Sequence, residues 1–142
     1  GLVPWTTPFG WVPLVIAAAV FAQRVFKKAW ARIFCGTLAL VAFDVVLDPG
    51  AVALGIWSYA KSGWYYGVPL TNFVGWIVTG SVALACLRNI GWEGNAALSG
   101  AMMMLAFWAG VAIGGGPVVP AIVGAALVLG LGWMAKRPVR QA

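Results

Sequence analysis

Long apolar runs separated by short polar breaks dominate this chain. A helix needs roughly 17–25 predominantly apolar residues to cross a bilayer, and most of the runs approach that length. The shortest run, the first, can be extended by the Pro8-Phe9-Gly10 stretch that precedes it. The pattern predicts an all-α integral membrane protein, folded as one membrane domain over residues 1–142. Its five predicted transmembrane helices cover residues 11–26, 31–47, 68–87, 96–113 and 118–135.

The segment between the second and third runs has a different composition. The second run is expected to stop at Asp48-Pro49-Gly50, because proline disfavours helix in the preceding residue and glycine lets the chain turn. The stretch from Ala51 to Gly67 is too short and too broken for a span. It is rich in Trp and Tyr, whose amphipathic rings favour headgroup level. We therefore predict an aromatic-rich interfacial or re-entrant segment here.

Composition supports lipid as the solvent. Of the 142 residues, 63% are hydrophobic and only 8% are charged, against about 25% charged residues in a typical soluble domain. The net charge of +6 could favour nucleic acid. However, the basic residues form short clusters beside apolar runs, where the positive-inside rule puts them. We expect membrane lipids as partners and no nucleic acid.

The basic residues also predict an orientation. With five spans, all but Lys61 fall on one side of the membrane. That side is cytoplasmic under the positive-inside rule. We expect a bacterial or archaeal cytoplasmic membrane, with the N-terminus outside and the C-terminus in the cytoplasm. The clustered residues are Arg24, Lys27, Lys28, Arg32, Arg88, Lys136, Arg137 and Arg140.

Small residues and cysteines add two expectations. The last two runs contain a GxxxG pair, Gly110 and Gly114, and further glycines that favour close helix packing in lipid. Those further glycines are Gly124, Gly130 and Gly132. Cys35 and Cys86 lie inside apolar runs, and the chain has no His. We therefore expect buried thiols and no metal site.

Two aspartates are the most conspicuous polar residues. Asp44 and Asp48 are four positions apart, so on a helix they share one face. Asp48 either caps the helix end near the headgroups or belongs to a functional site. Asp44 lies a turn deeper, after the apolar run from Ile33 to Phe43, where an ionised carboxylate is costly. Its carboxyl must pair, accept hydrogen bonds or stay protonated, and a neutral carboxyl is a proton donor.

Asn72 and a group of aromatic residues complete the candidate site. Asn72 lies in the first turn of the third predicted span, and its amide can bridge a carboxyl, orient a water or simply join two helices. The rings either form an interfacial belt or line a slot where their electron-rich faces stabilise a cation. An acid beside such rings suits proton addition to an alkene, followed by capture of the cation by water. The candidate lining residues are Trp57, Tyr59, Trp64, Tyr65, Tyr66 and Trp76.

The run YYGVPLTNFVGW, from Tyr65 to Trp76, together with the upstream Asp44 and Asp48-Pro49, resembles the CruF-type carotenoid hydratases. These include the bisanhydrobacterioruberin hydratases and γ-carotene 1′,2′-hydratases. The resemblance implies a membrane enzyme of carotenoid biosynthesis that needs no cofactor. It would add water across the terminal double bond of an acyclic ψ end group and leave a tertiary alcohol. On this chain, the depth and charge of the residues, rather than the motif, favour Asp44 as the acid and Asp48 or Asn72 as the group that orients the water.

One departure from the family keeps an alternative open. Family members are longer and carry further membrane helices before the matched region. This chain has its first Met at Met102, so we expect a processed, short or truncated member. The alternative is a non-catalytic subunit that binds a carotenoid or another polyene lipid, or serves as a scaffold. Its partners would be other transmembrane subunits of a larger membrane complex, including a photosynthetic one.

Overall fold

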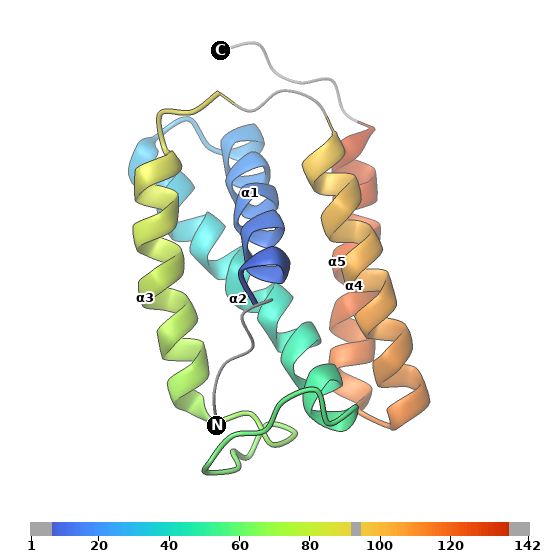
Figure 1. Cartoon of the computed structure of the whole chain (residues 1–142). Coiled ribbons are helices and arrows are strands. Elements are labelled where there is room, and N and C mark those ends of the chain that lie inside the picture. The colour runs from blue at the N-terminus through green and yellow to red at the C-terminus, as the bar shows by residue number, and fades with distance from the viewer. Residues whose placement is uncertain (1–6, 92–94, 137–142) are drawn as a thin grey trace.

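Five helices make up the structure, a computed structural model that describes residues 7–91 and 95–136 (Figure 1). All five are long and apolar enough to cross a membrane, which confirms the predicted all-α membrane fold. Over these residues there is no strand, only two isolated β-bridges in the loop after the second helix. The helices are α1 (Thr7–Val25), α2 (Ala29–Ala53), α3 (Leu70–Leu87), α4 (Ala96–Gly115) and α5 (Val118–Ala135).

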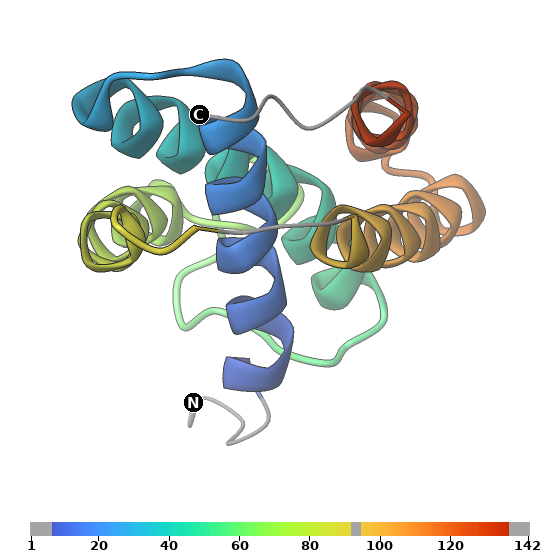
Figure 2. The ribbon, with the colours of Figure 1, turned by 90° about the horizontal axis from the view of Figure 1, so that it is seen from above.

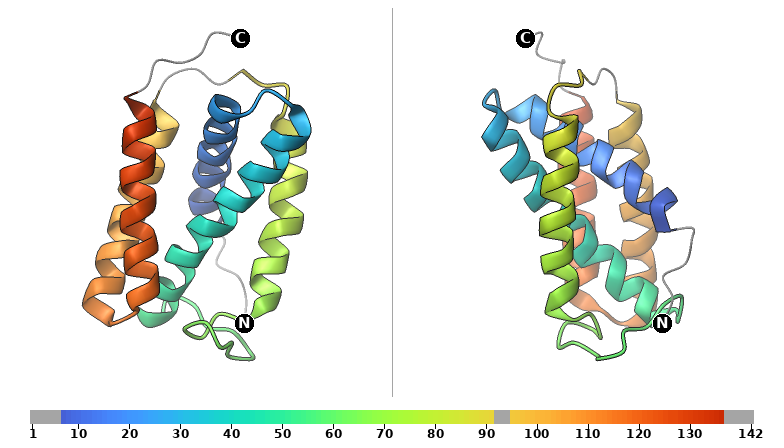
Figure 3. Two further views of the ribbon diagram at one scale, coloured as in Figure 1. Left: turned by 180° about the vertical axis from the view of Figure 1, so that it is seen from behind. Right: turned by 60° about the vertical axis from the view of Figure 1, so that its left-hand side comes forward.

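Helix α2 organises the bundle, because it packs against each of the other four helices. Seen from above, α1 and α2 lie between α3 on one side and the α4–α5 pair on the other (Figure 2). Seen from behind, α2 crosses obliquely between these two flanks (Figure 3). Side chains along α2 can therefore contact both flanks of the bundle.

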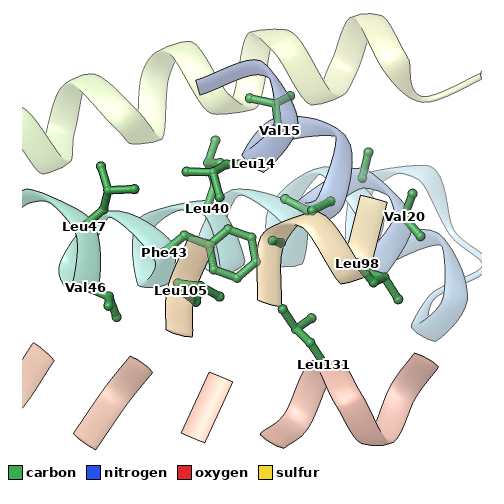
Figure 4. Close-up of a cluster of buried hydrophobic side chains, with 14 of the residues drawn as sticks. Leu14, Val15, Val20, Leu40, Phe43, Val46, Leu47, Leu98, Leu105 and Leu131 are labelled. Atoms are coloured by element: carbon green, nitrogen blue, oxygen red, sulfur yellow. The ribbon is translucent and has the colours of Figure 1, made fainter. Parts of the chain in front are cut away.

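The hydrophobic core lies where α2 meets α1, α4 and α5 (Figure 4). Leu40, Phe43 and Leu47 recur at the spacing that places side chains on one helix face. Phe43 and Leu40 are almost fully buried. They meet Leu14 of α1 and Leu105 of α4 in one cluster. This packing fixes the rotation of α2 about its own axis.

Glycines allow close helix contacts at only some of the predicted positions. A Cβ added to Gly124 of α5 would lie 2.7 Å from the Cβ of Ala109 in α4 and 3.0 Å from Val46 in α2. The GxxxG pair behaves differently, because a Cβ added to Gly110 or Gly114 would meet nothing within 4 Å. The prediction of close packing is therefore right for Gly124. It is wrong for the GxxxG pair within the described chain.

The predicted end of the second helix is wrong. Helix α2 does not stop at Asp48-Pro49-Gly50 but continues to Ala53. Proline removes a single N–H group, and the rest of the helical hydrogen bonding resumes beyond it. The chain leaves the helix at Gly55, two residues beyond Ala53, where a φ of +66° suits glycine. There the Ile56 N–H donates to the Ala51 carbonyl at 2.9 Å, as in a Schellman motif.

The two ends of the bundle differ in character. The α1–α2 connection, the end of α3, the start of α4 and the end of α5 lie at one end (Figure 1). The aromatic-rich loop between α2 and α3 lies at the other and carries Lys61. Six of the predicted cytoplasmic basic residues belong to the first end, whereas Arg137 and Arg140 lie outside the described residues. Which end faces the cytoplasm stays a prediction.

Candidate active site

Both aspartates are buried, and one amide joins them. Asp44 has 0% and Asp48 2% of its surface exposed. The Asn72 side-chain nitrogen donates to Oδ2 of Asp44 at 2.9 Å and to Oδ2 of Asp48 at 2.6 Å. An amide nitrogen carries two hydrogens, so it can serve both carboxyls at once. The first turn of α3 thus connects two successive turns of α2.

Asp48 accepts a second hydrogen bond, from the Tyr59 hydroxyl at 2.5 Å. Burial, followed by the bond to Asp48, raises the pKa of Tyr59 above its usual range, so the hydroxyl remains a donor. One oxygen of Asp48 therefore collects two donors. The alternative that Asp48 caps a helix end near the headgroups is wrong, because α2 continues past it and its carboxyl lies inside the protein.

One carboxyl oxygen of Asp44 forms no hydrogen bond with any residue of the described chain. Its Oδ1 atom is buried and lacks a partner among those residues. Over the same residues, neither aspartate forms an ion pair. The carboxyls are instead balanced by donors and by the positive end of α3, which begins beside them. Leaving a buried acceptor unsatisfied costs about 1–3 kcal/mol, so this oxygen calls for a chemical explanation.

Tyr65 reaches the backbone of α2 between the two aspartates. Its hydroxyl donates to the Val45 carbonyl at 3.1 Å. Burial is the main cause that raises the pKa of Tyr65 to about 12, so this hydroxyl also remains a donor at neutral pH. The ring lies edge-on to Phe73 of α3, with centroids 5.8 Å apart. Tyr65 therefore links the aromatic loop to both helices that carry the site.

A tight turn holds Tyr65 in this position. Tyr66 and Gly67 both have positive φ, at 49° and 87°, as in a type I′ turn. The Val68 N–H closes the turn on the Tyr65 carbonyl at 2.8 Å. A side chain at Gly63 would overlap the Val68 carbonyl, so the loop requires glycine there. The Tyr66 hydroxyl accepts a 3.4 Å hydrogen bond from the backbone N–H of Val119, at the start of α5.

Only some of the aromatic residues predicted to line the site lie beside the carboxyls. Tyr59 and Tyr65 join the site through their hydroxyls, and Tyr66 packs edge-on against Tyr65. Trp57 is half-buried, with an indole N–H that lacks a partner among the described residues. Trp64 is 82% exposed and Trp76 packs against Trp11 of α1, with centroids 6.5 Å apart.

Sequence reasoning missed three contributors to this region: Trp11, Phe73 and the Val45 carbonyl. Trp11 and Phe73 are apolar residues in apolar helices, and nothing in the sequence distinguishes them from lipid-facing rings. The Val45 carbonyl, in contrast, could have been identified from the sequence. A proline at position 49 inside a helix leaves the carbonyl four residues earlier without its N–H partner.

The arrangement suits proton chemistry better than cation binding. Within residues 7–91 and 95–136 there is no group of three or more His, Cys, Asp or Glu side chains that could hold a metal. Asn72 and Tyr59 point hydrogens at the carboxyl oxygens, which is the opposite of what a cation needs. Two neighbouring carboxyls with an unpartnered oxygen can exchange and deliver protons.

Comparison with known proteins places the chain in a family. A family model described as "carotenoid biosynthesis protein" matches residues 1–131. A bisanhydrobacterioruberin hydratase from Haloarcula japonica is 38% identical over 88 residues, which cover 59% of this chain and 30% of that protein. The matched part therefore spans less than a third of that relative's length. No solved structure matches. Because the family model covers nearly the whole described bundle, the chain belongs to the carotenoid biosynthesis protein family.

Proposed function

We propose that this membrane protein is a carotenoid hydratase, which adds water to the terminal double bond of an acyclic carotenoid end group. The observation that carries the proposal is the buried Asp44 carboxyl, with one oxygen bonded to Asn72 and the other without a partner in the described chain. The similarity to a protein named as a hydratase supports the same reaction class. The carboxyl cluster supplies an acid, and the bundle supplies apolar surroundings for a polyene.

The hydrogen bonds favour different roles for the two aspartates. Asp48 receives donors from Tyr59 and Asn72 on one oxygen, an arrangement that stabilises a carboxylate. Asp44 receives a donor from Asn72, on Oδ2. We therefore assign the proton of the pair to Oδ1 of Asp44, the oxygen that receives no donor in the described chain. Asp44 is the general acid in this proposal, and Asp48 is the base.

The reaction follows from these roles. Asp44 transfers its proton to the CH carbon of the terminal C=C bond, and the π electrons form the new C–H bond. The positive charge is left on the neighbouring, more substituted carbon. Water adds its oxygen to that carbon and loses a proton to Asp48. Proton transfer from Asp48 back to Asp44 restores the starting state, so the net change is one added water.

Aromatic rings near the cluster can stabilise the cation. A ring face stabilises a nearby cation by about 0.5–2 kcal/mol, and the effect is largest where water is excluded. The Tyr59 hydroxyl bonds to Asp48, and the Tyr65 hydroxyl bonds to the Val45 carbonyl between the two aspartates. The proposal assigns the lining role to these two first, with Trp57 beside them in the same loop.

A labelled-water experiment tests the proposed reaction. Membranes that contain the protein are supplied with an acyclic carotenoid such as lycopene in water enriched in ¹⁸O, and products are separated and weighed by mass spectrometry. The expected product carries one added water with the heavy oxygen on a tertiary alcohol. Membranes without the protein are the control. Equal amounts of product from both membranes would refute the proposal.

A second candidate function is a non-catalytic subunit that binds a carotenoid within a larger membrane assembly. The observation in its favour is that both carboxyls are almost completely buried in the described chain, with 0% of Asp44 and 2% of Asp48 exposed. Purification in a mild detergent distinguishes the two. A chain that carries pigment and co-purifies with other membrane subunits, yet produces no alcohol in the labelled-water experiment, would favour this second function.

A further inference from the structure

We propose that Tyr65 is a positioning residue for the two aspartates: its hydroxyl replaces the backbone hydrogen bond that Pro49 removes from α2. In this role Tyr65 acts on the helix rather than on the substrate. The idea concerns the same site as the proposed hydratase function, and only its activity readout rests on that function.

The first step is the missing bond in α2. In a helix the carbonyl of residue 45 accepts the N–H of residue 49, but proline has no N–H to donate. Pro49 is nevertheless inside α2 and buried. In a membrane an unsatisfied backbone carbonyl is expensive, so neighbouring groups usually satisfy it. The Val45 carbonyl is therefore an acceptor that needs a partner from outside its own helix.

The second step is the partner. The Tyr65 hydroxyl lies 3.1 Å from that carbonyl and donates to it. The loop is built to hold this ring, with a backbone bond across the turn and a positive φ at Tyr66. A non-glycine residue with positive φ costs energy, and it persists where the surrounding structure fixes it. The turn and the hydroxyl thus act together on one carbonyl of α2.

The third step is the place of that carbonyl. Val45 and Pro49 each directly follow an aspartate, so the missing bond lies within the turn that separates Asp44 from Asp48. Asn72 bridges these carboxyls with bonds of 2.9 and 2.6 Å. That bridge requires a fixed separation between the two turns. The hydrogen bond from Tyr65 to the Val45 carbonyl restrains the distance between these turns at the point where α2 lacks its own backbone hydrogen bond.

Four proteins test the proposal: the natural sequence, Tyr65→Phe, Pro49→Ala and the double variant. Tyr65→Phe removes only the hydroxyl. Pro49→Ala returns an N–H to position 49, so the Val45 carbonyl regains its helical partner. The melting temperature of each protein is measured in one detergent. Tyr66→Phe, alone and combined with Pro49→Ala, is the matched control from the same loop.

We expect Tyr65→Phe alone to lower the melting temperature by about 2–4 °C, the loss typical of one buried hydrogen bond in a protein of this size. In the Pro49→Ala background the same change should have almost no effect. Tyr66→Phe should have the same effect in both backgrounds, because its hydroxyl bonds to α5. If Tyr65→Phe proves too unstable to purify, adding Pro49→Ala should restore the protein.

Activity separates positioning from mere stability. With Pro49 present, Tyr65→Phe should lower kcat by about 10–100-fold with little change in KM, since small displacements of catalytic groups have effects of that size. It should also shift the pH profile of kcat. In the Pro49→Ala background, neither effect should appear. Equal losses of stability and kcat in both backgrounds would overturn the proposal. An absence of turnover in the natural protein would count against the hydratase function, while the melting temperatures would still decide the role of Tyr65.

Discussion

At the scale of single residues, the site is a set of donors matched to acceptors in apolar surroundings. Asn72 divides its two hydrogens between Asp44 and Asp48, and Tyr59 adds a second donor to Asp48. Tyr65 supplies the donor that α2 lacks at Val45. Within the described chain, Oδ1 of Asp44 is left without a donor, and it is the atom proposed to give up a proton.

The tyrosine donors predict a loss of stability at alkaline pH. The pKa of Tyr65 is raised from 10.0 to about 12 in the folded protein, so its ionised form favours the unfolded chain. The contribution of this group to stability is therefore complete below pH 10 and is lost as the pH rises towards 12. Melting temperatures measured from neutral to alkaline pH should show this decline. Tyr65→Phe should make it shallower, and an unchanged slope would contradict this account.

At the scale of helices, local sequence rules succeeded where apolar runs had clear polar ends. The predicted last helix, 118–135, coincides with α5, and the others agree to within a few residues except at one end. That end is the C-terminus of α2, where the helix continues through Pro49 and the Val45 carbonyl accepts a hydrogen bond from Tyr65, which is distant in sequence. Rules that consider only neighbouring residues cannot predict a contact between residues so far apart in the sequence.

The contrast between local sequence patterns and long-range contacts also explains which site residues could be predicted. Asp44, Asp48 and Asn72 were identifiable because polar side chains are rare in long apolar segments and have few possible partners. The rings were harder. Trp64 and Tyr65 are adjacent, yet Trp64 is 82% exposed while Tyr65 bonds to α2. Their opposite placement depends on a tight turn, and the sequence alone does not fix its direction.

Helix packing predicts an asymmetry between two glycines of α5. Gly124→Val should destabilise the protein by about 1–3 kcal/mol, because the added atoms would collide with Ala109 and Val46. Gly130→Val is the matched control, since a Cβ there meets nothing within 4 Å. Denaturant unfolding in one detergent measures both. Equal destabilisation would show that the α4–α5 contact is not as tight as described.

At the scale of the whole molecule, the two ends of the bundle have separate characters. The end with the α1–α2 connection is basic, and polar side chains join its helices there, as when Asn95 donates to the Ala135 carbonyl at 2.9 Å. The other end carries the aromatic loop and the nearby carboxyl site. We propose that the basic end faces the cytoplasm, as the positive-inside rule requires. The site then lies in the outer half of the membrane.

Cysteine labelling tests this orientation. Cys35 and Cys86 are first replaced by Ala, and a single cysteine is then introduced at Ser62 or at Lys28, both of which are exposed. An impermeant maleimide should label Ser62→Cys in intact cells, and Lys28→Cys only after the cells are opened. The reverse pattern would invert the topology without altering the internal geometry of the site.

The central claim is that Asp44 donates the proton that starts the reaction, and turnover of Asp44→Asn tests it most directly. The change preserves shape but removes the acid, so the rate of alcohol formation should fall by about 10²–10⁴-fold, the usual contribution of a general acid. Thr79→Val is the control, because the Thr79 hydroxyl is exposed and bonds to its own helix at Gly75. It should keep full activity. An Asp44→Asn protein that forms the alcohol as fast as the Thr79→Val control would contradict the account.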